Sequence, residues 1–289
     1  MFHQIEKVVV LGAGTMGKGI AQWFCQNGIK VQLTDVNHQA LIESYNSILA
    51  SWDKLQAKGK FDQFQIETFK KNLSHAGKAE LDPHADLIIE AIVEDKDVKR
   101  SVFKEYDEHF AEKTIFASNT SSIPIASLCH DMSVKRRSRF LGLHFFNPAT
   151  LMKLVEIIKT PWTDEKIVTE LENFFNKAGK ETAQCQDRPG FIVNRVARNF
   201  YGEALRIAKH DDEEVYKAID STMKEVGGFK MGPFELMDLI GVDVNYQVSN
   251  SVWNAFYNEA RFTPHHLQKQ MVDSGRHGRK TKQGFYKYE

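Results

Sequence analysis

Short apolar runs alternate with segments of helical periodicity from the start of the chain to about residue 186. The segment Lys7–Leu11 (KVVVL) is rich in β-branched residues, which predicts a strand buried on both faces, as in a parallel sheet. Further strands are predicted at 30–34, 86–90, 114–117, 140–143, 154–158 and 181–183, with helices from the first glycines to 27 and at 39–58, 61–71, 96–110 and 164–178. Strands that alternate with helices predict an α/β fold with a doubly wound sheet.

The pattern changes at the sequence Asp187-Arg188-Pro189-Gly190. Helical periodicity dominates beyond this point, with helices predicted at 191–208, 213–226, 233–257 and 264–274. We therefore predict two domains, residues 1–186 and residues 187–289, the second mostly helical. The acidic run 211–214 is interpreted as a solvated helix start, favoured by the helix dipole, and not as a metal site.

Composition narrows the possible partners. Lys plus Arg and Asp plus Glu both number 38, so the chain has no net charge that would attract nucleic acid or an anionic membrane. No apolar stretch is long enough to span a membrane, and the first residues do not resemble a signal peptide. Three isolated cysteines indicate reduced thiols in a cytoplasmic protein, with neither a disulfide framework nor a zinc site.

A glycine motif follows the first predicted strand and opens the first helix. Gly12 permits a tight turn, Gly14 lets a diphosphate approach the backbone, and Gly17 allows close packing of helix and strand. Asp35 ends the next strand, where a carboxylate can accept hydrogen bonds from ribose hydroxyls and repels a 2′-phosphate. The motif therefore predicts NAD in preference to NADP. FAD, which uses a similar loop, and a glycine turn without a ligand are the alternatives.

A histidine and a glutamate stand out in the second half of the predicted sheet. His144 follows a predicted strand at the edge where open α/β sheets bind ligands. Glu156 lies within the apolar strand 154–158, where an unpaired charge is costly. A His144–Glu156 pair accounts for both the position of the histidine and the charge in the apolar strand, because the carboxylate orients the imidazole and stabilises its protonated form. A histidine of this kind can remove the proton of an alcohol that is oxidised.

The hydroxyl-rich segment 118–122 (SNTSS) follows the strand 114–117. Its side chains can contact nicotinamide or a substrate oxygen. The other interpretation is a cap for the helical segment after Pro124, because Ser and Thr are favoured at helix starts. Spacing alone does not separate the two.

Several motifs, taken in order, resemble the L-3-hydroxyacyl-CoA dehydrogenases. They span nearly the whole chain and are GAGTMG at 12–17, EAIVE at 90–94, SNTSS at 118–122, HFFNP at 144–148, PGFIVNR at 189–195, MGPFEL at 231–236 and GRKTKQGFY at 278–286. The resemblance implies a Rossmann domain, a helical domain that forms a homodimer, and NAD-dependent, reversible oxidation of a 3-hydroxyacyl-CoA to a 3-ketoacyl-CoA. It also implies a setting in fatty acid metabolism, such as β-oxidation.

The resemblance assigns roles by position. His144 is implied as general base or acid with Glu156 as its partner, while Ser121 and Asn194 hold the reacting oxygen. Because Asn194 follows the predicted boundary, the site is expected in a cleft between the domains. NAD contacts are implied for Gly12, Gly14, Thr15, Met16, Gly17, Asp35, Glu94, Lys99, Ser121, Asn147 and Lys280. Ser51 and Lys58 are implied to contact coenzyme A, alongside Ser121 and Asn194 at the acyl end.

One departure and two alternatives stay open. The family usually has glycine where this chain has Lys282, which questions the local turn and the NAD contact of Lys280. A β-hydroxyacid dehydrogenase of the L-gulonate type, without a CoA substrate, is the nearest other enzyme, and a non-catalytic NAD-binding protein is the other alternative. Short-chain dehydrogenases are excluded, because no tyrosine has a lysine four residues later. Acyl chain length is not readable from the sequence.

Overall fold

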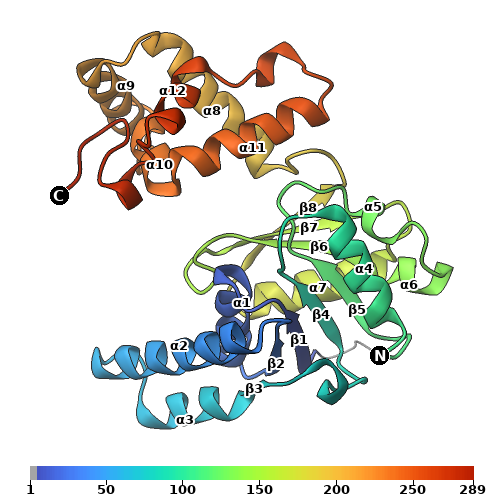
Figure 1. Ribbon diagram of the computed structural model, residues 1–289. Coiled ribbons are helices and arrows are strands. Elements are labelled where there is room, and N and C mark those ends of the chain that lie inside the picture. The colour runs from blue at the N-terminus through green and yellow to red at the C-terminus, as the bar shows by residue number, and fades with distance from the viewer. Residues whose placement is uncertain (1–4) are drawn as a thin grey trace. The chain divides into compact units, whose positions relative to one another are not determined.

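The computed structural model describes residues 5–289 and contains two compact units, which divide between Arg188 and Pro189 (Figure 1). The boundary predicted from the sequence, between residues 186 and 187, lies two residues earlier. The expectation that no signal peptide is present draws partly on residues 1–4, which lie outside the described residues. No helix among residues 5–289 is long and apolar enough to cross a membrane.

The elements of the first unit follow the predicted alternation. Its strands are β1 (Lys7–Leu11), β2 (Lys30–Thr34), β3 (Leu73–His75), β4 (Leu87–Glu90), β5 (Ile115–Ser118), β6 (Phe140–Phe145), β7 (Leu154–Lys159) and β8 (Glu181–Gln186). Its helices are α1 (Thr15–Gln26), α2 (His38–Ala57), α3 (Gln63–Asn72), α4 (Lys96–Asp107), α5 (Ala126–Cys129), α6 (Val134–Ser138) and α7 (Glu165–Lys177). The short strand β3 and the short helices α5 and α6 were not predicted.

All eight strands form one sheet with the order β3-β2-β1-β4-β5-β6-β7-β8. Strands β1 to β6 are parallel to one another, so the predicted doubly wound sheet is confirmed. The edge adds a feature that the pattern did not predict, because β7 runs antiparallel to β6 and β8 runs parallel to β7. The chain reverses direction across the sheet between β1 and β4, which is where such folds bind dinucleotides.

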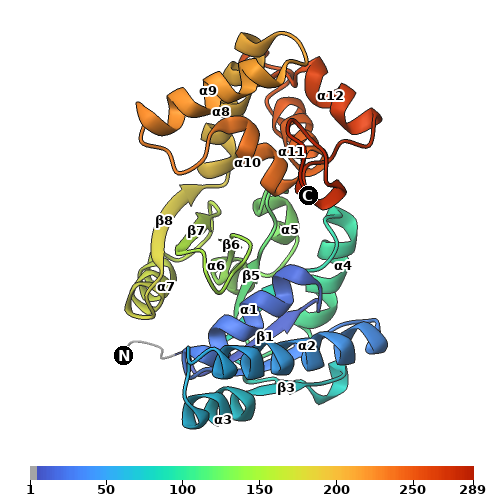
Figure 2. The same cartoon turned by 90° about the vertical axis from the view of Figure 1, so that its left-hand side faces the viewer.

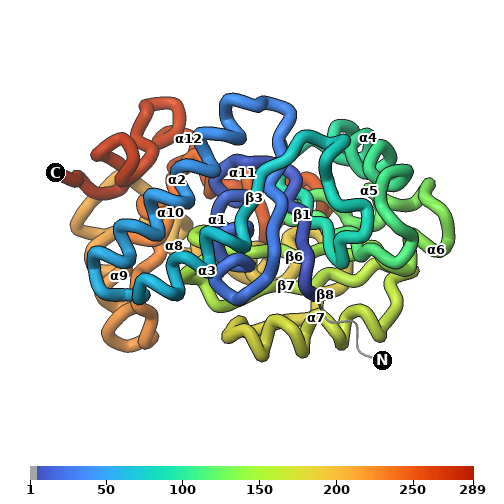
Figure 3. Tube along the Cα trace, turned by 90° about the horizontal axis from the view of Figure 1, so that it is seen from below, coloured from blue at the N-terminus to red at the C-terminus, as the bar shows by residue number. Residues whose placement is uncertain are grey.

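Helices cover both faces of the sheet. On one face α1 and α7 lie side by side, with Trp23 and Phe24 of α1 packed against the rings of Phe174 and Phe175. On the other face Phe103 of α4 packs edge-on against Phe140 of β6. Figure 3 shows α4 and α7 on opposite sides of the strands. The apolar core therefore fixes the parallel strands, and their carboxyl ends form one edge that carries loops.

The second unit is built from helices α8 (Val193–Ala208), α9 (Glu213–Glu225), α10 (Pro233–Ile240), α11 (Val242–Ala255) and α12 (His266–Asp273), seen in Figure 2. The single helix predicted at 233–257 is wrong. Gly241 adopts a φ of 103°, a conformation that other residues rarely take, and this ends α10 before α11 begins. The predicted helix start at 211–214 is confirmed, since Asp212 caps α9 by accepting the N–H of Glu214.

Two buried carboxylates hold the end of the chain against α9 and α10. Asp238 accepts the N–H groups of Phe285 and Tyr286 and the hydroxyl of Tyr288, each at 2.9–3.0 Å. Asp220 accepts the N–H groups at the start of α10 and the hydroxyl of Tyr286. A Cβ at Gly284 would lie 2.0 Å from Asp238 Oδ1, so only glycine fits there. The GFY motif near the end of the chain therefore has a structural function in this unit.

Lys282 lies in the turn where the family usually has glycine. It adopts the left-handed conformation, with φ 58° and ψ 6°, which a glycine takes without steric cost. The turn is nevertheless formed, since the carbonyl of Lys282 accepts the N–H of Tyr288 at 2.9 Å. The departure from glycine thus leaves the local turn in place.

Replacing Asp238 by alanine is expected to destabilise the second unit by about 3 kcal/mol, because two buried N–H groups and a hydroxyl lose their acceptor. Urea unfolding measures the loss, and hydrogen exchange at Phe285 and Tyr286 reports its location. The exposed neighbour Leu239, replaced by alanine, is the control. Unchanged protection of the two amides in Asp238→Ala would show that Asp238 does not hold the chain end.

Candidate active site

The glycine loop lies between the carboxyl end of β1 and the start of α1. Gly12 has a φ of 102°, and a Cβ there would lie 2.6 Å from the carbonyl oxygen of Ala91. A Cβ at Gly17 would lie 1.8 Å from the carbonyl oxygen of Gly12, whereas one at Gly14 would meet nothing within 4 Å. Gly12 and Gly17 therefore allow close backbone packing, and Gly14 leaves open space.

That open space faces the N-terminus of α1. No side chain caps this helix and its first turn holds no acidic residue, so its N–H groups and positive dipole end are available to a diphosphate. Thr15 is exposed in this first turn, while Met16 is half-buried and packs against the core. The loop thus fits the diphosphate of a dinucleotide.

Asp35 follows β2 and is held next to the loop. Its Oδ2 accepts the N–H of Ala13 at 2.7 Å and its Oδ1 accepts the N–H of Asn37 at 2.8 Å. These bonds fix the carboxylate without using all of its lone pairs, and the side chain is half-buried. A ribose of a dinucleotide on the loop can therefore donate hydroxyl hydrogens to Asp35.

The structure brings His144 and Glu156 together. They are direct partners in the antiparallel register of β6 and β7, and Nδ1 of His144 lies 2.6 Å from Oε2 of Glu156. Glu156 is fully buried and His144 nearly so. Because a carboxylate only accepts, this bond places a proton on Nδ1 and makes Nε2 the basic nitrogen of the neutral ring. His144 belongs to β6, whose strand extends two residues beyond the predicted end.

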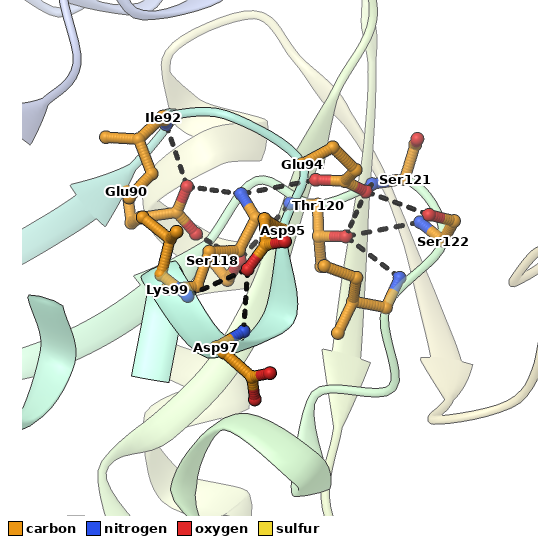
Figure 4. Close-up of polar contacts among 12 residues, drawn as sticks. Glu90, Ile92, Glu94, Asp95, Asp97, Lys99, Ser118, Thr120, Ser121 and Ser122 are labelled. Atoms are coloured by element: carbon orange, nitrogen blue, oxygen red, sulfur yellow. Dashed lines mark hydrogen bonds and ion pairs between the residues drawn. The ribbon is translucent and has the colours of Figure 1, made fainter. Parts of the chain in front are cut away.

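A network of charged and hydroxyl groups lies where β4 and β5 end (Figure 4). The buried ammonium of Lys99 contacts Glu90 at 2.5 Å and Glu94 at 3.2 Å. Glu90 also accepts the hydroxyl of Ser118 at 2.6 Å and the N–H of Ile92 at 2.8 Å. Every polar group of this buried pair thus has a partner, as the cost of burying charge requires.

Glu94 connects this network to the segment 120–122. Its Oε1 accepts the hydroxyls of Thr120 and Ser122 and the N–H of Ser121. Burial raises the pKa of Glu94, but the ammonium of Lys99 and the two hydroxyls outweigh burial and hold that pKa below its usual value. Glu94 is therefore held in its ionised form and can act as an acceptor.

The capping interpretation of the segment 118–122 is wrong. The helix after Pro124 is only α5, and the N–H groups of Ile125 and Ala126 at its start donate to the carboxylate of Asp187, at 2.8 and 2.7 Å. The hydroxyls of Ser118, Thr120 and Ser122 instead bind Glu90 and Glu94. Asn119 links the segment to β6 by accepting the N–H of Phe145 at 2.9 Å. These contacts place the segment beside the end of the strand that carries His144.

Comparison with known proteins identifies the group to which this architecture belongs. Residues 7–188 match the family described as "3-hydroxyacyl-CoA dehydrogenase, NAD binding domain", and residues 190–288 match its C-terminal domain. The chain belongs to the 3-hydroxyacyl-CoA dehydrogenase family.

Several relatives match this chain over nearly its full length. The chain is 40% identical to the mitochondrial hydroxyacyl-coenzyme A dehydrogenase of Sus scrofa, covering 99% of this chain and 92% of that protein. A structure of 3-hydroxybutyryl-CoA dehydrogenase from Escherichia coli superposes with a TM-score of 0.93 at 38% identity, covering 99% of this chain and 60% of that one. The (S)-3-hydroxybutyryl-CoA dehydrogenase from Ralstonia eutropha gives a TM-score of 0.89 at 32% identity, covering 99% of this chain and all of that one.

The residues that the resemblance to 3-hydroxyacyl-CoA dehydrogenases implied fall into three groups. Most lie at or after the carboxyl ends of β1, β2, β4, β5 and β6, among them the exposed Asn147, and two lie beside these ends, Lys99 in α4 and Glu156 in β7. Ser51 and Lys58 lie apart from them, in and just after α2, where Ser51 accepts a hydrogen bond from Gln22 at 3.3 Å and Lys58 is exposed. The other two belong to the second unit: Asn194 is in the first turn of α8, and Lys280 pairs with Asp243 at 2.6 Å. Their roles stay predictions.

Three residues near the site were not predicted from the sequence. Glu90 ends the apolar strand 86–90, and the argument that identified Glu156, a charge inside a buried strand, applies to it equally. Val36 directly follows Asp35 and its side chain is fully exposed, which gives an apolar surface beside the carboxylate. Nothing in the sequence near Asn119 predicts a role for its side chain, because the N–H group that it accepts belongs to Phe145 on another strand.

A buried lysine holds the loop that follows His144 and Asn147. Nζ of Lys180 donates to the carbonyl oxygens of Ala149 and Met152, both at 2.5 Å, and lies 5.0 Å from the ring centre of Trp23. Burial lowers the pKa of Lys180 to about 8, from its ordinary 10.5. A neutral amine still donates two hydrogens, so the loop contacts do not depend on the charge.

This shift predicts a pH dependence of stability. Because the pKa of Lys180 is lower in the folded chain, the unfolded chain binds more protons between about pH 8 and 10.5, and folding stability gains as pH rises through this window. Lys180→Met removes this gain. Urea unfolding of both proteins at pH 7, 8, 9 and 10 is the measurement. A stability difference between the two proteins that is the same at every pH would contradict the prediction.

Proposed function

We propose that this chain oxidises the 3-hydroxyl group of an (S)-3-hydroxyacyl-CoA to the 3-ketoacyl-CoA with NAD, and catalyses the reverse reaction. The observation that carries the proposal is the His144–Glu156 pair, held on the same sheet edge as the glycine loop in a chain that belongs to this family. The names of the relatives, hydroxyacyl-CoA and 3-hydroxybutyryl-CoA dehydrogenases, support the substrate class.

His144 acts as the base. Nε2 takes the hydroxyl proton while Glu156, bonded to Nδ1, stabilises the imidazolium that forms. The glycine loop and Asp35 would hold NAD, which would supply the acceptor for the hydride. In the reverse direction the imidazolium returns its proton to the reacting oxygen.

Two further residues hold the reacting oxygen toward His144. The backbone of Ser121 is fixed through Glu94, which leaves its hydroxyl to the substrate. Asn194, from the second unit, is proposed as the other donor to this oxygen. Hydrogen bonds from both residues strengthen as negative charge develops on the oxygen.

Coenzyme A is proposed to extend along α2, where Ser51 and Lys58 contact it. Lys58 is an exposed cation at the end of this helix and suits a phosphate group. We also propose that the protein works as a homodimer in the cytoplasm, in fatty acid β-oxidation. Its three cysteines are buried free thiols, in keeping with a reducing compartment.

NADH-dependent reduction of acetoacetyl-CoA tests the function directly. Turnover of the CoA thioester is the expected result. Turnover restricted to free hydroxy acids such as L-gulonate would favour the dehydrogenase without a CoA substrate, and no turnover would favour a non-catalytic NAD-binding protein.

His144→Ala is expected to lower kcat about a hundredfold or more, because the proton no longer has an acceptor. NADH binding, followed by fluorescence, stays near that of the unchanged protein, since the glycine loop and Asp35 are intact. Replacing the exposed His38, at the start of α2, by alanine is the control. A kcat close to normal in His144→Ala would contradict the proposed role of His144 as the base.

Asp35→Ala is expected to weaken NAD binding about tenfold and to relax discrimination against NADP, because a charged acceptor for the ribose is lost. Since Asp35 also holds Ala13 and Asn37, Asp35→Asn serves as a comparison that keeps one acceptor oxygen. The ratio of affinities for NADH and NADPH is the decisive quantity. If the ratio does not change in Asp35→Ala, the ribose role is refuted.

A further inference from the structure

Glu90 is a fully buried carboxylate at the carboxyl end of β4, and the proposed reaction does not use it. Its two oxygens accept from three groups, the ammonium of Lys99, the N–H of Ile92 and the hydroxyl of Ser118. Ser118 ends β5, the strand that leads into the segment 119–122. Glu90 thus connects the ends of two neighbouring strands that both carry loops of the site.

Lys99 extends this connection to Glu94. Its side chain is 1% exposed, so its ammonium reaches no solvent and is held by the two carboxylates at 2.5 and 3.2 Å. Removing Glu90 would leave a buried cation short of a partner, and removing Lys99 would leave a buried carboxylate short of one. The NAD contact implied for Lys99 stays a prediction, and in this position its charge also acts on Glu94.

Glu94 then holds the segment 120–122. One of its oxygens accepts from Thr120, from Ser122 and from the backbone of Ser121. In Figure 4 the side chain of Ser121 points away from Glu94, while its N–H points toward it. The backbone of Ser121 is therefore fixed and its hydroxyl is directed elsewhere.

We propose that the buried Glu90–Lys99 pair is a positioning device for the reaction, acting through Glu94 on the hydroxyl of Ser121. The inference rests on the proposed function for the role of that hydroxyl. The ammonium keeps Glu94 ionised and directed at the segment, and Glu90 keeps the ammonium in place. Neither Glu90 nor Lys99 touches the substrate in this proposal.

A charge-neutral double variant separates this role from simple structural support. Glu90→Gln alone leaves the ammonium with one carboxylate and should lower the melting temperature. Glu90→Gln combined with Lys99→Met removes both charges while keeping similar volumes, and such exchanges of buried ion pairs are often neutral for stability. The melting temperature of the double variant is expected to lie within a few degrees of that of the unchanged protein. In this variant Glu94 nevertheless lacks its buried cation.

The kinetic constants decide the matter. For acetoacetyl-CoA reduction by the double variant, we expect kcat to fall about tenfold while KM for acetoacetyl-CoA changes less than about twofold, since Ser121 acts on the reacting oxygen in the transition state. Kd for NADH should rise about fivefold, because Glu94 is no longer fixed. The matched control is Lys7→Met with Asp82→Asn, which removes an ion pair at the opposite end of β1.

A double variant with normal melting temperature, normal kcat and normal Kd for NADH overturns the inference. If the unchanged protein does not reduce acetoacetyl-CoA, the proposed function fails, and the NADH titration still tests the link to Glu94. If the double variant does not fold, Glu94→Gln decides, because that side chain is 40% exposed and tolerates the change. A normal kcat and normal Kd for NADH in Glu94→Gln would then overturn it.

Discussion

A carboxylate buried in a protein must receive hydrogen bonds or a cation, and this constraint organises both units of the chain. Glu156 receives the imidazole of His144, Glu90 the ammonium of Lys99, and Asp238 the end of the chain. Each acid lies in or beside apolar packing, and each fixes a segment that apolar contacts alone would leave loose. The positions of the loops therefore depend on a few buried charges.

Besides the buried carboxylates, the site depends on the direction of the strands in the sheet. Because β1, β2, β4, β5 and β6 are parallel, the segments that follow them gather at one edge. The antiparallel return of β7 then places Glu156 directly opposite His144. The cofactor loop and the acid–base pair thus belong to one rigid element, which favours precise placement of reacting groups.

Much of this arrangement could be predicted from the sequence, since its signals are local. Apolar runs located most of the strands, the spacing of Gly12, Gly14 and Gly17 located the cofactor loop, and a charge in an apolar strand identified Glu156. Glu90 is likewise a charge in a buried strand, so its network could have been predicted in the same way. These features depend on a few neighbouring residues and on the cost of burial.

Other features could not be predicted because their causes are distant in sequence. Asp187 caps a helix that begins some sixty residues earlier, so the hydroxyls of the segment 118–122 were free for another task. Helical periodicity continues through Gly241, and only the positive φ of that residue shows the break. The antiparallel direction of β7 follows from the path of the loop after Asn147, which leaves no periodic signal.

The register of β6 and β7 also governs which changes of length the chain can accept. A shift of β7 by one residue would bring Val155 or Ile157 opposite His144 and would turn the carboxylate of Glu156 to the other face of the sheet. The loop 146–153 between the strands is not subject to this restriction, because the ladder and not the loop sets the pairing. Changes of length in that loop would therefore leave the acid–base pair intact, but they would move Asn147 or the carbonyl groups of Ala149 and Met152 that Lys180 holds.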